Sequence, residues 1–146
     1  MKKIAIAAVL CIAGAVLAHM HVVSQRYYPM VKVLAPDGVT FIAVQDMTQE
    51  RRACGDANSR FLEPVKARCQ ECKVIAARCE RVVDGVEERA LLEGKPLPGY
   101  LVLAPGLRLS ISGPDRSARA NCEYIAGDML KRGLRNVACL GPGSRM

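Results

Sequence analysis

The sequence predicts an α+β domain: a ferredoxin-like two-layer sandwich built from a duplicated βαβ unit and stapled by disulfides. The first observation is a repeat, since the stretches Leu34–Cys54 and Leu103–Cys122 both begin with Leu-Ala-Pro and end in a cysteine. The second is that each stretch carries an alternating apolar strand before a helix. The third is that six cysteines remain once Cys11 in the N-terminal apolar run is set aside, and an even number is typical of a disulfide framework.

Residues 1–23 have the pattern of a secretory signal peptide or a membrane anchor. Lys2 and Lys3 precede an uncharged apolar run, Ile4–Ala18, which is the layout of a secretory signal. Small residues before His19 permit cleavage there, whereas extension of the run to Val23 gives enough length for an anchor. A buried core helix is a third interpretation, but it leaves the two lysines unexplained. Signal and anchor both place the rest of the chain outside the cytoplasm, in the periplasm, secreted or anchored to the inner membrane.

The charge pattern argues against a nucleic-acid partner. The chain has a formal net charge of +7, but its basic residues are scattered among acidic ones and it contains no Trp. Nucleic-acid binding needs a clustered basic footprint. We expect a mildly basic surface with weak attraction for anionic envelope polymers, and contact with the membrane only through the N-terminal segment.

The folded domain is expected over residues 30–142, with copies at about 34–79 and 103–140. In the first copy, alternation over 39–44 predicts a strand. Asp46 or Thr48 can cap a helix that runs to about Lys66. A strand at Lys73–Arg78 then completes the unit.

The second copy follows the same order. A strand at 107–112 leads into a helix headed by Asp115, and Gly133 closes that helix near Arg132. The last strand is expected at Asn136–Cys139.

Three further elements are expected outside the two units. Met30–Leu34 and Tyr100–Ala104 are predicted to add short outer strands, each ended by a proline. The linker Glu80–Gly99 contains a short predicted helix, Val86–Glu93, followed by glycines and prolines typical of loops.

Element lengths restrict how the cysteines can pair. A helix and the strand that follows it run antiparallel in a βαβ unit, so the strand returns along the helix at about 3.3 Å per residue against about 1.5 Å for the helix. The last cysteine of each copy therefore returns to the level of the helix cysteine, within the roughly 7 Å between Cα atoms that a disulfide allows. The remaining two pair across a turn that only the first copy has. The predicted disulfides are Cys54–Cys79, Cys122–Cys139 and Cys69–Cys72.

The motif from Cys69 to Cys72 also has the spacing of a redox site. A thioredoxin-type site places its first cysteine at a helix N-terminus, where the helix dipole lowers the pKa. Here the motif follows a helix, and Glu71 adds an unfavourable negative charge. A structural disulfide is the favoured interpretation, with redox catalysis as an alternative. Zinc binding by these two cysteines and two other thiolates would need a reducing environment.

Little else in the sequence indicates catalysis. His19 and His21 are the only histidines, so the expected domain has none for a Ser-His-Asp or Cys-His arrangement or for a histidine metal site. The adjacent acids Glu87 and Glu88 point in different directions on a helix. We expect neither an enzyme nor a cofactor.

Strand alternation also predicts a possible ligand face. Ile75, Ala77 and Cys79 are expected to face the helices with the core, while the opposite face mixes aliphatic, hydroxyl and guanidinium groups. Such a mixture suits a polar ligand with several contacts. The alternative is that the linker Glu80–Gly99 covers this face. The possible ligand face comprises Thr40, Arg78, Arg108, Ser110 and Ser112.

The stretch Leu107–Leu140 resembles the second half of a SPOR (sporulation-related repeat) domain, which runs as a strand, Gly-Pro, an Ala/Arg-rich helix, a Gly and a short strand. In the first copy, Ala43-Val44-Gln45 stands where that family has its Val-Gln strand end, although Asp46 and Met47 replace the usual Gly and aromatic residue. The likeness covers roughly half of the chain. It implies an envelope module that binds peptidoglycan glycan strands on the sheet face away from the helices. The matching residues are Arg108, Gly113, Pro114, Arg119, Ala120, Leu130, Gly133 and Val137.

These observations together predict a non-enzymatic accessory module of the envelope that binds a glycan or a protein partner. One alternative is a periplasmic thiol-disulfide redox protein that uses Cys69 and Cys72. Another is a structural or inhibitory subunit of an envelope complex, which would bury its sheet face against one partner.

Overall fold

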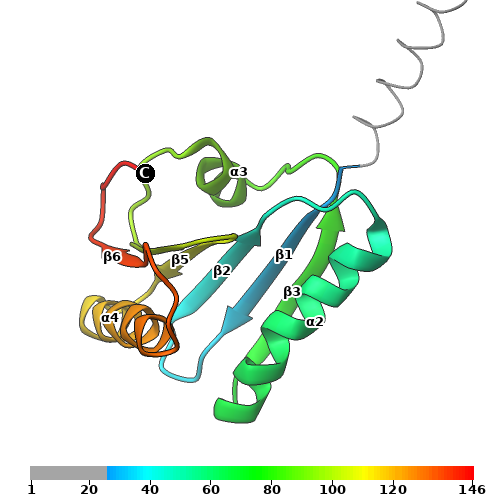
Figure 1. Ribbon diagram of the computed structural model, residues 1–146. Coiled ribbons are helices and arrows are strands. Elements are labelled where there is room, and N and C mark those ends of the chain that lie inside the picture. Colours follow the sequence, from blue (N-terminus) through cyan, green and yellow to red (C-terminus); the bar gives the residue numbers. More distant parts are fainter. Residues whose placement is uncertain (1–25) are drawn as a thin grey trace, which may run out of the picture.

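The structure is a computed structural model, and it describes residues 26–146. The predicted signal or anchor at residues 1–23 lies outside the described residues. Within 26–146, none of the helices is both long and apolar enough to cross a bilayer. The elements in chain order (Figure 1) are β1 Tyr28–Leu34, β2 Thr40–Gln45, α2 Arg51–Arg68, β3 Lys73–Glu80, α3 Val86–Glu93, β4 Tyr100–Ala104, β5 Leu107–Ser112, α4 Asp115–Lys131 and β6 Ala138–Leu140.

The strands form one six-stranded sheet in the order β3-β1-β2-β5-β4-β6, with every neighbouring pair antiparallel. This is the predicted α+β class. The predicted outer position of β1 and β4 is wrong, because each lies between two strands of its own half. Short loops make each a hairpin with the next strand, and the buried side chains of Met30, Val31 and Val33 need neighbours on both sides. Each half is therefore a ββαβ unit, and the halves meet where β2 pairs with β5, a junction that we call the seam.

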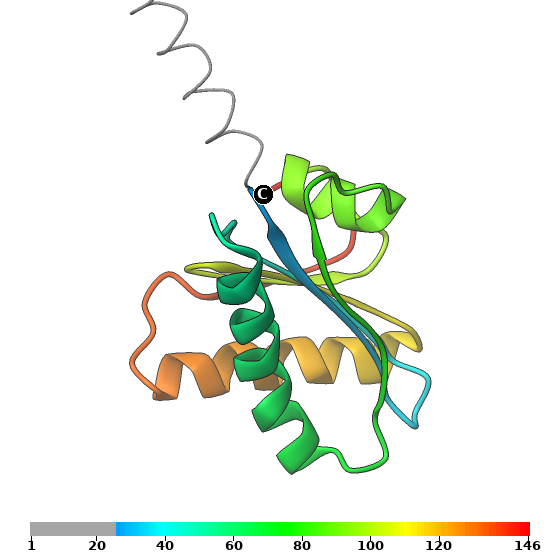
Figure 2. The ribbon, with the colours of Figure 1, turned by 90° about the vertical axis from the view of Figure 1, so that its right-hand side faces the viewer.

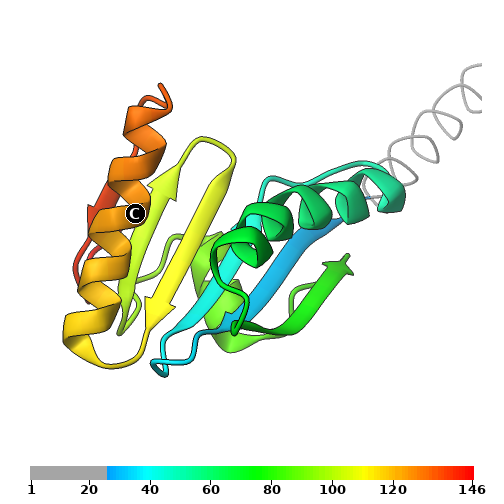
Figure 3. The ribbon, with the colours of Figure 1, turned by 90° about the horizontal axis from the view of Figure 1, so that it is seen from below.

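The helices occupy both faces of the sheet. Helix α2 packs on β1 and β3, and α4 packs on β4, β5 and β6, so that both cover the same face (Figure 3). Helix α3 lies on the opposite face, against β2 and β5 (Figure 2). The predicted two-layer sandwich thus gains a third layer, which is α3. This helix has the bounds that the sequence predicted. The cause is the apolar far face of the seam, where Ile42 and Val44 are buried under the fully buried Leu91.

Two apolar cores hold these layers together. On the α2/α4 side, the predicted core residues Val39, Leu109 and Ile111 are buried. Ile75 was expected in the core but is 54% exposed. A register shift opposite Lys32 and Val33 makes Ile75 an extra residue on β3, and such a β-bulge interrupts the alternation of side chains.

Some element ends differ from the sequence prediction. Helix α2 begins at Arg51 and not at a cap by Asp46 or Thr48, because the backbone of Thr48 pairs with Tyr27 and is held extended. Helix α4 begins at Asp115 as predicted. Strand β6 begins two residues later than predicted, since Asn136 has a φ of 59° and cannot belong to a strand.

Three cysteine pairs lie at disulfide distance, and they are the pairs that the sequence predicts. The Cα–Cα distances are 5.9 Å for Cys54–Cys79, 5.6 Å for Cys122–Cys139 and 5.3 Å for Cys69–Cys72. The first ties α2 to β3, and the second ties α4 to β6. Each long bridge therefore pins a helix to an edge strand of its own half.

We expect the long bridges to stabilise the fold more than the short one. Replacement of Cys54 and Cys79 by Ala should lower the free energy of unfolding by about 3 kcal/mol, because a closed loop with a sequence separation of 25 restricts the unfolded chain. Replacement of Cys69 and Cys72 by Ala should cost about 2 kcal/mol or less, since that separation is 3. Denaturant unfolding of the three oxidised proteins measures this order, and a larger loss for the short bridge would contradict it.

Candidate functional site

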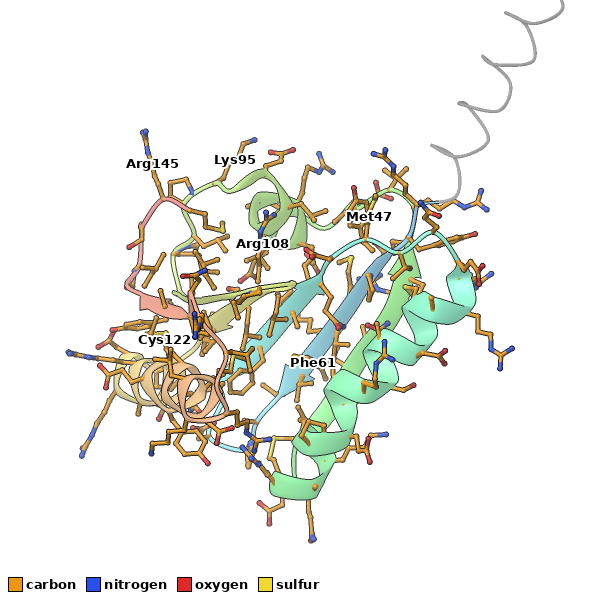
Figure 4. The ribbon with its side chains drawn as sticks, in the orientation of Figure 1. Met47, Phe61, Lys95, Arg108, Cys122 and Arg145 are labelled. Carbon is orange, nitrogen blue, oxygen red and sulfur yellow. A yellow bond between two sulfur atoms is a disulfide. The ribbon has the colours of Figure 1, made fainter. Side chains whose placement is uncertain are left out.

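A groove of about 930 Å³ runs between α2 and α4 on their side of the sheet. It exists because each helix packs on strands of its own half, so neither covers the seam, as Figure 3 shows. Figure 4 places Phe61 in the space between α2 and the sheet. The apolar lining includes Phe41, Leu107 and Leu109 on the strands, Phe61 and Val65 on α2, and Ile125 and Met129 on α4.

The helix residues of the groove form a second apolar stripe beside the one that fixes each helix to the sheet. Phe61 and Val65 are four residues apart on α2, as are Ile125 and Met129 on α4. Residues at this spacing share one face of a helix. All four side chains are half-buried, so they remain accessible to a partner. Met129 adds a flexible side chain that adapts to irregular surfaces.

An ionic cluster joins the two helices at one end of the groove. Arg68 of α2 donates to Asp128 Oδ2 of α4 over 3.1 Å, and Arg132 donates to the same oxygen over 2.9 Å. The hydrogen bond from Arg68, together with the positive charge of Arg132, lowers the pKa of Asp128 below the usual range of an aspartate. Two cations therefore share one carboxylate here.

Two more polar side chains of the lining have free bonding capacity. The guanidinium of Arg60 forms no ion pair or hydrogen bond with any other residue of the described part. The amide of Asn121 donates to the carbonyl oxygen of Ser117 over 2.9 Å and has no second partner among residues 26–146. Asp37, the second carboxylate of the lining, accepts a hydrogen bond from the backbone of Val39 over 3.2 Å. The lining thus holds three guanidinium groups against two carboxylates.

The Cys69–Cys72 bridge also lines the groove. Both cysteines are half-buried, and Cys69 directly follows α2, where its backbone N–H donates to Val65 over 2.8 Å. The bridge is therefore the one disulfide of the lining among the described residues, while the two long bridges tie helices to the edge strands of the sheet.

Two residues of the predicted ligand face, Ser110 and Arg108, form hydrogen bonds with α3. Ser110 is fully buried and donates to Glu87 Oε1 over 2.7 Å. Arg108 donates to the carbonyl oxygens of Leu91 and Leu92 over 3.1 and 2.8 Å, so it satisfies the C-terminal end of α3. Helix α3 of the linker thus covers Ser110 at the centre of this face, as the alternative interpretation held for the whole face, while Arg108 stays exposed. Ligand binding by these residues stays a prediction.

The other three residues of that face lie around α3. Arg78 is paired with Glu80 over 3.1 Å and lies 3.9 Å from Glu88, with 55% of its side chain exposed. Thr40 and Ser112 are partners across the seam and are half-buried. The five residues therefore lie on one face of the sheet, as alternation predicted, but two of them, Arg108 and Ser110, form hydrogen bonds with α3.

Comparison of the chain with protein-family models, with curated proteins and with solved structures gives no match. Within the described range, no group of three or more His, Cys, Asp or Glu side chains is placed to hold a metal ion. Function has to be inferred from the groove and from the chemistry of its lining.

None of the apolar residues that α2 and α4 contribute to the groove was predicted as a site residue. A signal was present in the sequence, because Phe61, Val65, Ile125 and Met129 widen the apolar face of each helix beyond the stripe that its strands need. Whether a wide apolar face is buried or open depends on the distance between the helices. That distance is set by the sheet order, which periodicity does not give.

We expect Arg108→Ala to lower the free energy of unfolding by about 1 kcal/mol, because two carbonyl groups of α3 lose a charged donor. Denaturant unfolding of the full chain measures the change, and limited proteolysis should show faster cleavage within residues 81–99. Arg119→Ala is the matched control, since its ion pair with Glu123 on α4 is exposed on both sides and contributes little. Equal destabilisation by both substitutions would contradict the role given to Arg108.

We expect Arg68→Ala to raise the pKa of Asp128 towards its usual range, and by more than Arg132→Ala does, because the Arg68 hydrogen bond is the larger cause. The folded-state pKa of Asp128 is depressed, so its ion pairs contribute above the ordinary pKa and are lost as the pH falls through the folded-state pKa. Carboxyl NMR titration of the full chain measures this shift. No change in Arg68→Ala would show that the two helices are not joined by this pair.

Proposed function

We propose that the chain is a non-enzymatic, extracytoplasmic module of the cell envelope that binds a protein partner in the groove between α2 and α4. The observation that carries this proposal is an open, mostly apolar groove on a frame cross-linked by disulfides. A concave apolar site with a few polar groups is the usual form of a binding site. A structural or inhibitory subunit of an envelope complex would use the groove in the same way.

The compartment is supported by the cysteines. All six cysteines of the described part are paired, and structural disulfides persist in oxidising compartments such as the periplasm. The apolar run Ile4–Ala18 behind two lysines adds an independent argument for export.

A protein partner is favoured over a glycan by the chemistry of the two faces. The sheet face on which the SPOR resemblance implies glycan binding is the face covered by α3. The groove offers chiefly aliphatic and Phe side chains, with few of the hydrogen-bonding groups that a sugar polymer needs. Burial of apolar surface is instead the main driving force of protein association.

We infer further that the halves arose by duplication of one ββαβ unit. Leu34 pairs with Thr40 in the first hairpin, and Leu103 pairs with Arg108 in the second, so equivalent Leu-Ala-Pro residues hold equivalent positions. The unmatched Asp37 lies in the loop, where an extra residue leaves the register unchanged. Duplication would account for a groove walled by corresponding helices from the two halves.

A thiol-disulfide function of Cys69 and Cys72 is the second candidate, and it is favoured by the position of their bridge in the lining of the groove. A partner bound there would lie beside the bridge. With dithiothreitol as the reductant that regenerates the Cys69/Cys72 dithiol, faster reduction of insulin disulfides by the full chain, and loss of that acceleration in Cys69→Ser, would identify this function.

We expect the full chain to bind anilinonaphthalene sulfonate, an anionic apolar dye, because the groove combines apolar surface with a surplus of guanidinium groups. Dye fluorescence should rise on binding, and Ile125→Lys should abolish most of the rise by placing a charge in the groove.

The matched control is Tyr124→Lys, one residue away on α4. Tyr124 is 63% exposed and does not line the groove, so the dye should bind as in the parent chain. Equal loss in both variants, or no dye binding at all, would overturn the groove as a binding site. Retention of the chain on purified sacculi that Ile125→Lys leaves intact would favour a glycan partner instead.

A further inference from the structure

We propose that the occupant of the groove is a short, acidic, amphipathic helix of a partner protein, which completes the helical layer over the seam. This inference deepens the proposed function and rests on it.

The opposite face of the same seam already carries such a helix. Helix α3 is eight residues long and packs on β2 and β5, the two strands of the seam. Its sequence, VEERALLE, buries Leu91 completely and places Glu87 against the sheet. The seam is thus wide enough for one helix on the α3 face, whereas on the α2/α4 face α4 packs on β5 and neither α2 nor α4 packs on β2.

The size of the groove fits a helix of similar length. An α-helix with its side chains is about 10 Å across and rises about 1.5 Å per residue. A groove of about 930 Å³ therefore accepts about 12 Å of such a helix, or about two turns, if the segment is fully enclosed. This estimate is close to the length of α3.

The lining supplies an apolar floor and walls for one face of the helix. Phe41 and Leu107 on the seam are half-buried, so a docked helix would remove the rest of their surface from water. Phe61 and Met129 stand on opposite walls, and both side-chain types are common in grooves that bind amphipathic helices.

The arginines of the lining favour an acidic partner segment. Arg60 lines the groove without an ionic partner in the described part, and Arg68 and Arg132 share the single carboxylate of Asp128. An acidic side chain on the partner would find an unpaired guanidinium, whereas a basic one would meet a positive rim. Asn121 offers a further amide that can fix the orientation of the helix.

The test uses fluorescence anisotropy with the full chain and a side-chain-stapled helical peptide that carries residues 85–95 of this chain. This peptide copies the helix that the far face of the seam accepts. We expect saturable binding, weakened about fivefold or more by Arg60→Glu and also weakened by Phe61→Ala. A control peptide with Glu87→Lys and Glu88→Lys should bind at least about fivefold more weakly than the parent peptide.

The matched control in the chain is Arg52→Glu, which reverses a charge on the same helix outside the groove, and it should leave binding within about twofold. Peptide binding that Arg60→Glu and Phe61→Ala leave unchanged would overturn the proposal, as would equal binding of the lysine peptide.

Competition for the dye by phosphatidylglycerol vesicles but not by the peptide would assign the groove to lipid. Sedimentation that shows a dimer broken by Arg60→Glu would assign it to a second copy of the chain. If dye still binds and Ile125→Lys removes it while the peptide fails, the proposed binding function stands and only the helical partner is refuted.

Discussion

The antiparallel pairing of β2 with β5 is the constraint on which the rest of the molecule depends. Six residue pairs, from Thr40↔Ser112 to Gln45↔Leu107, join two ββαβ halves whose helices α2 and α4 pack on strands of their own half. A seam in the middle of a sheet has two faces, and each must be covered or remain open to water. Here α3 covers one face, and the groove between α2 and α4 leaves the other accessible.

The disulfides explain why the helices do not close over that groove. Cys54–Cys79 ties α2 to β3, and Cys122–Cys139 ties α4 to β6, which are the two outermost strands of the sheet. Each bridge therefore holds its helix towards an edge and away from the seam. An ion pair between Arg68 and Asp128 draws the two helices together at one end. An exposed ion pair is a weak tie, whereas a disulfide is covalent. The bridges therefore help to hold the two helices at the separation that the sheet order sets.

The sequence predicted the helices and strands better than it predicted which strands lie next to each other in the sheet. Alternation and helical spacing are local properties, so the strands, the helices and the bounds of α3 followed from them. The lengths of the helices and strands between the cysteines were enough to select the cysteine pairs. The position of β1 inside the sheet did not follow, because a buried run such as Met30–Leu34 has the same pattern at an edge and in the interior. The role of Arg108 was missed for a related reason, since a guanidinium that binds a ligand and one that caps a helix look alike in a sequence.

Strand alternation gives the two faces of the seam different chemistry, and this difference bears on function. On the α3 side, Arg108 and Ser110 form hydrogen bonds with the helix. Removal of α3 would therefore leave polar groups without hydrogen-bond partners and would also expose apolar side chains. On the groove side, Phe41, Leu107 and Leu109 offer apolar surface without such bonds. A helix docked there gains by burial and leaves no broken hydrogen bonds on the seam when it departs. The face that forms hydrogen bonds with its helix therefore suits a permanent helix of the chain itself, and the apolar face suits a partner that binds reversibly.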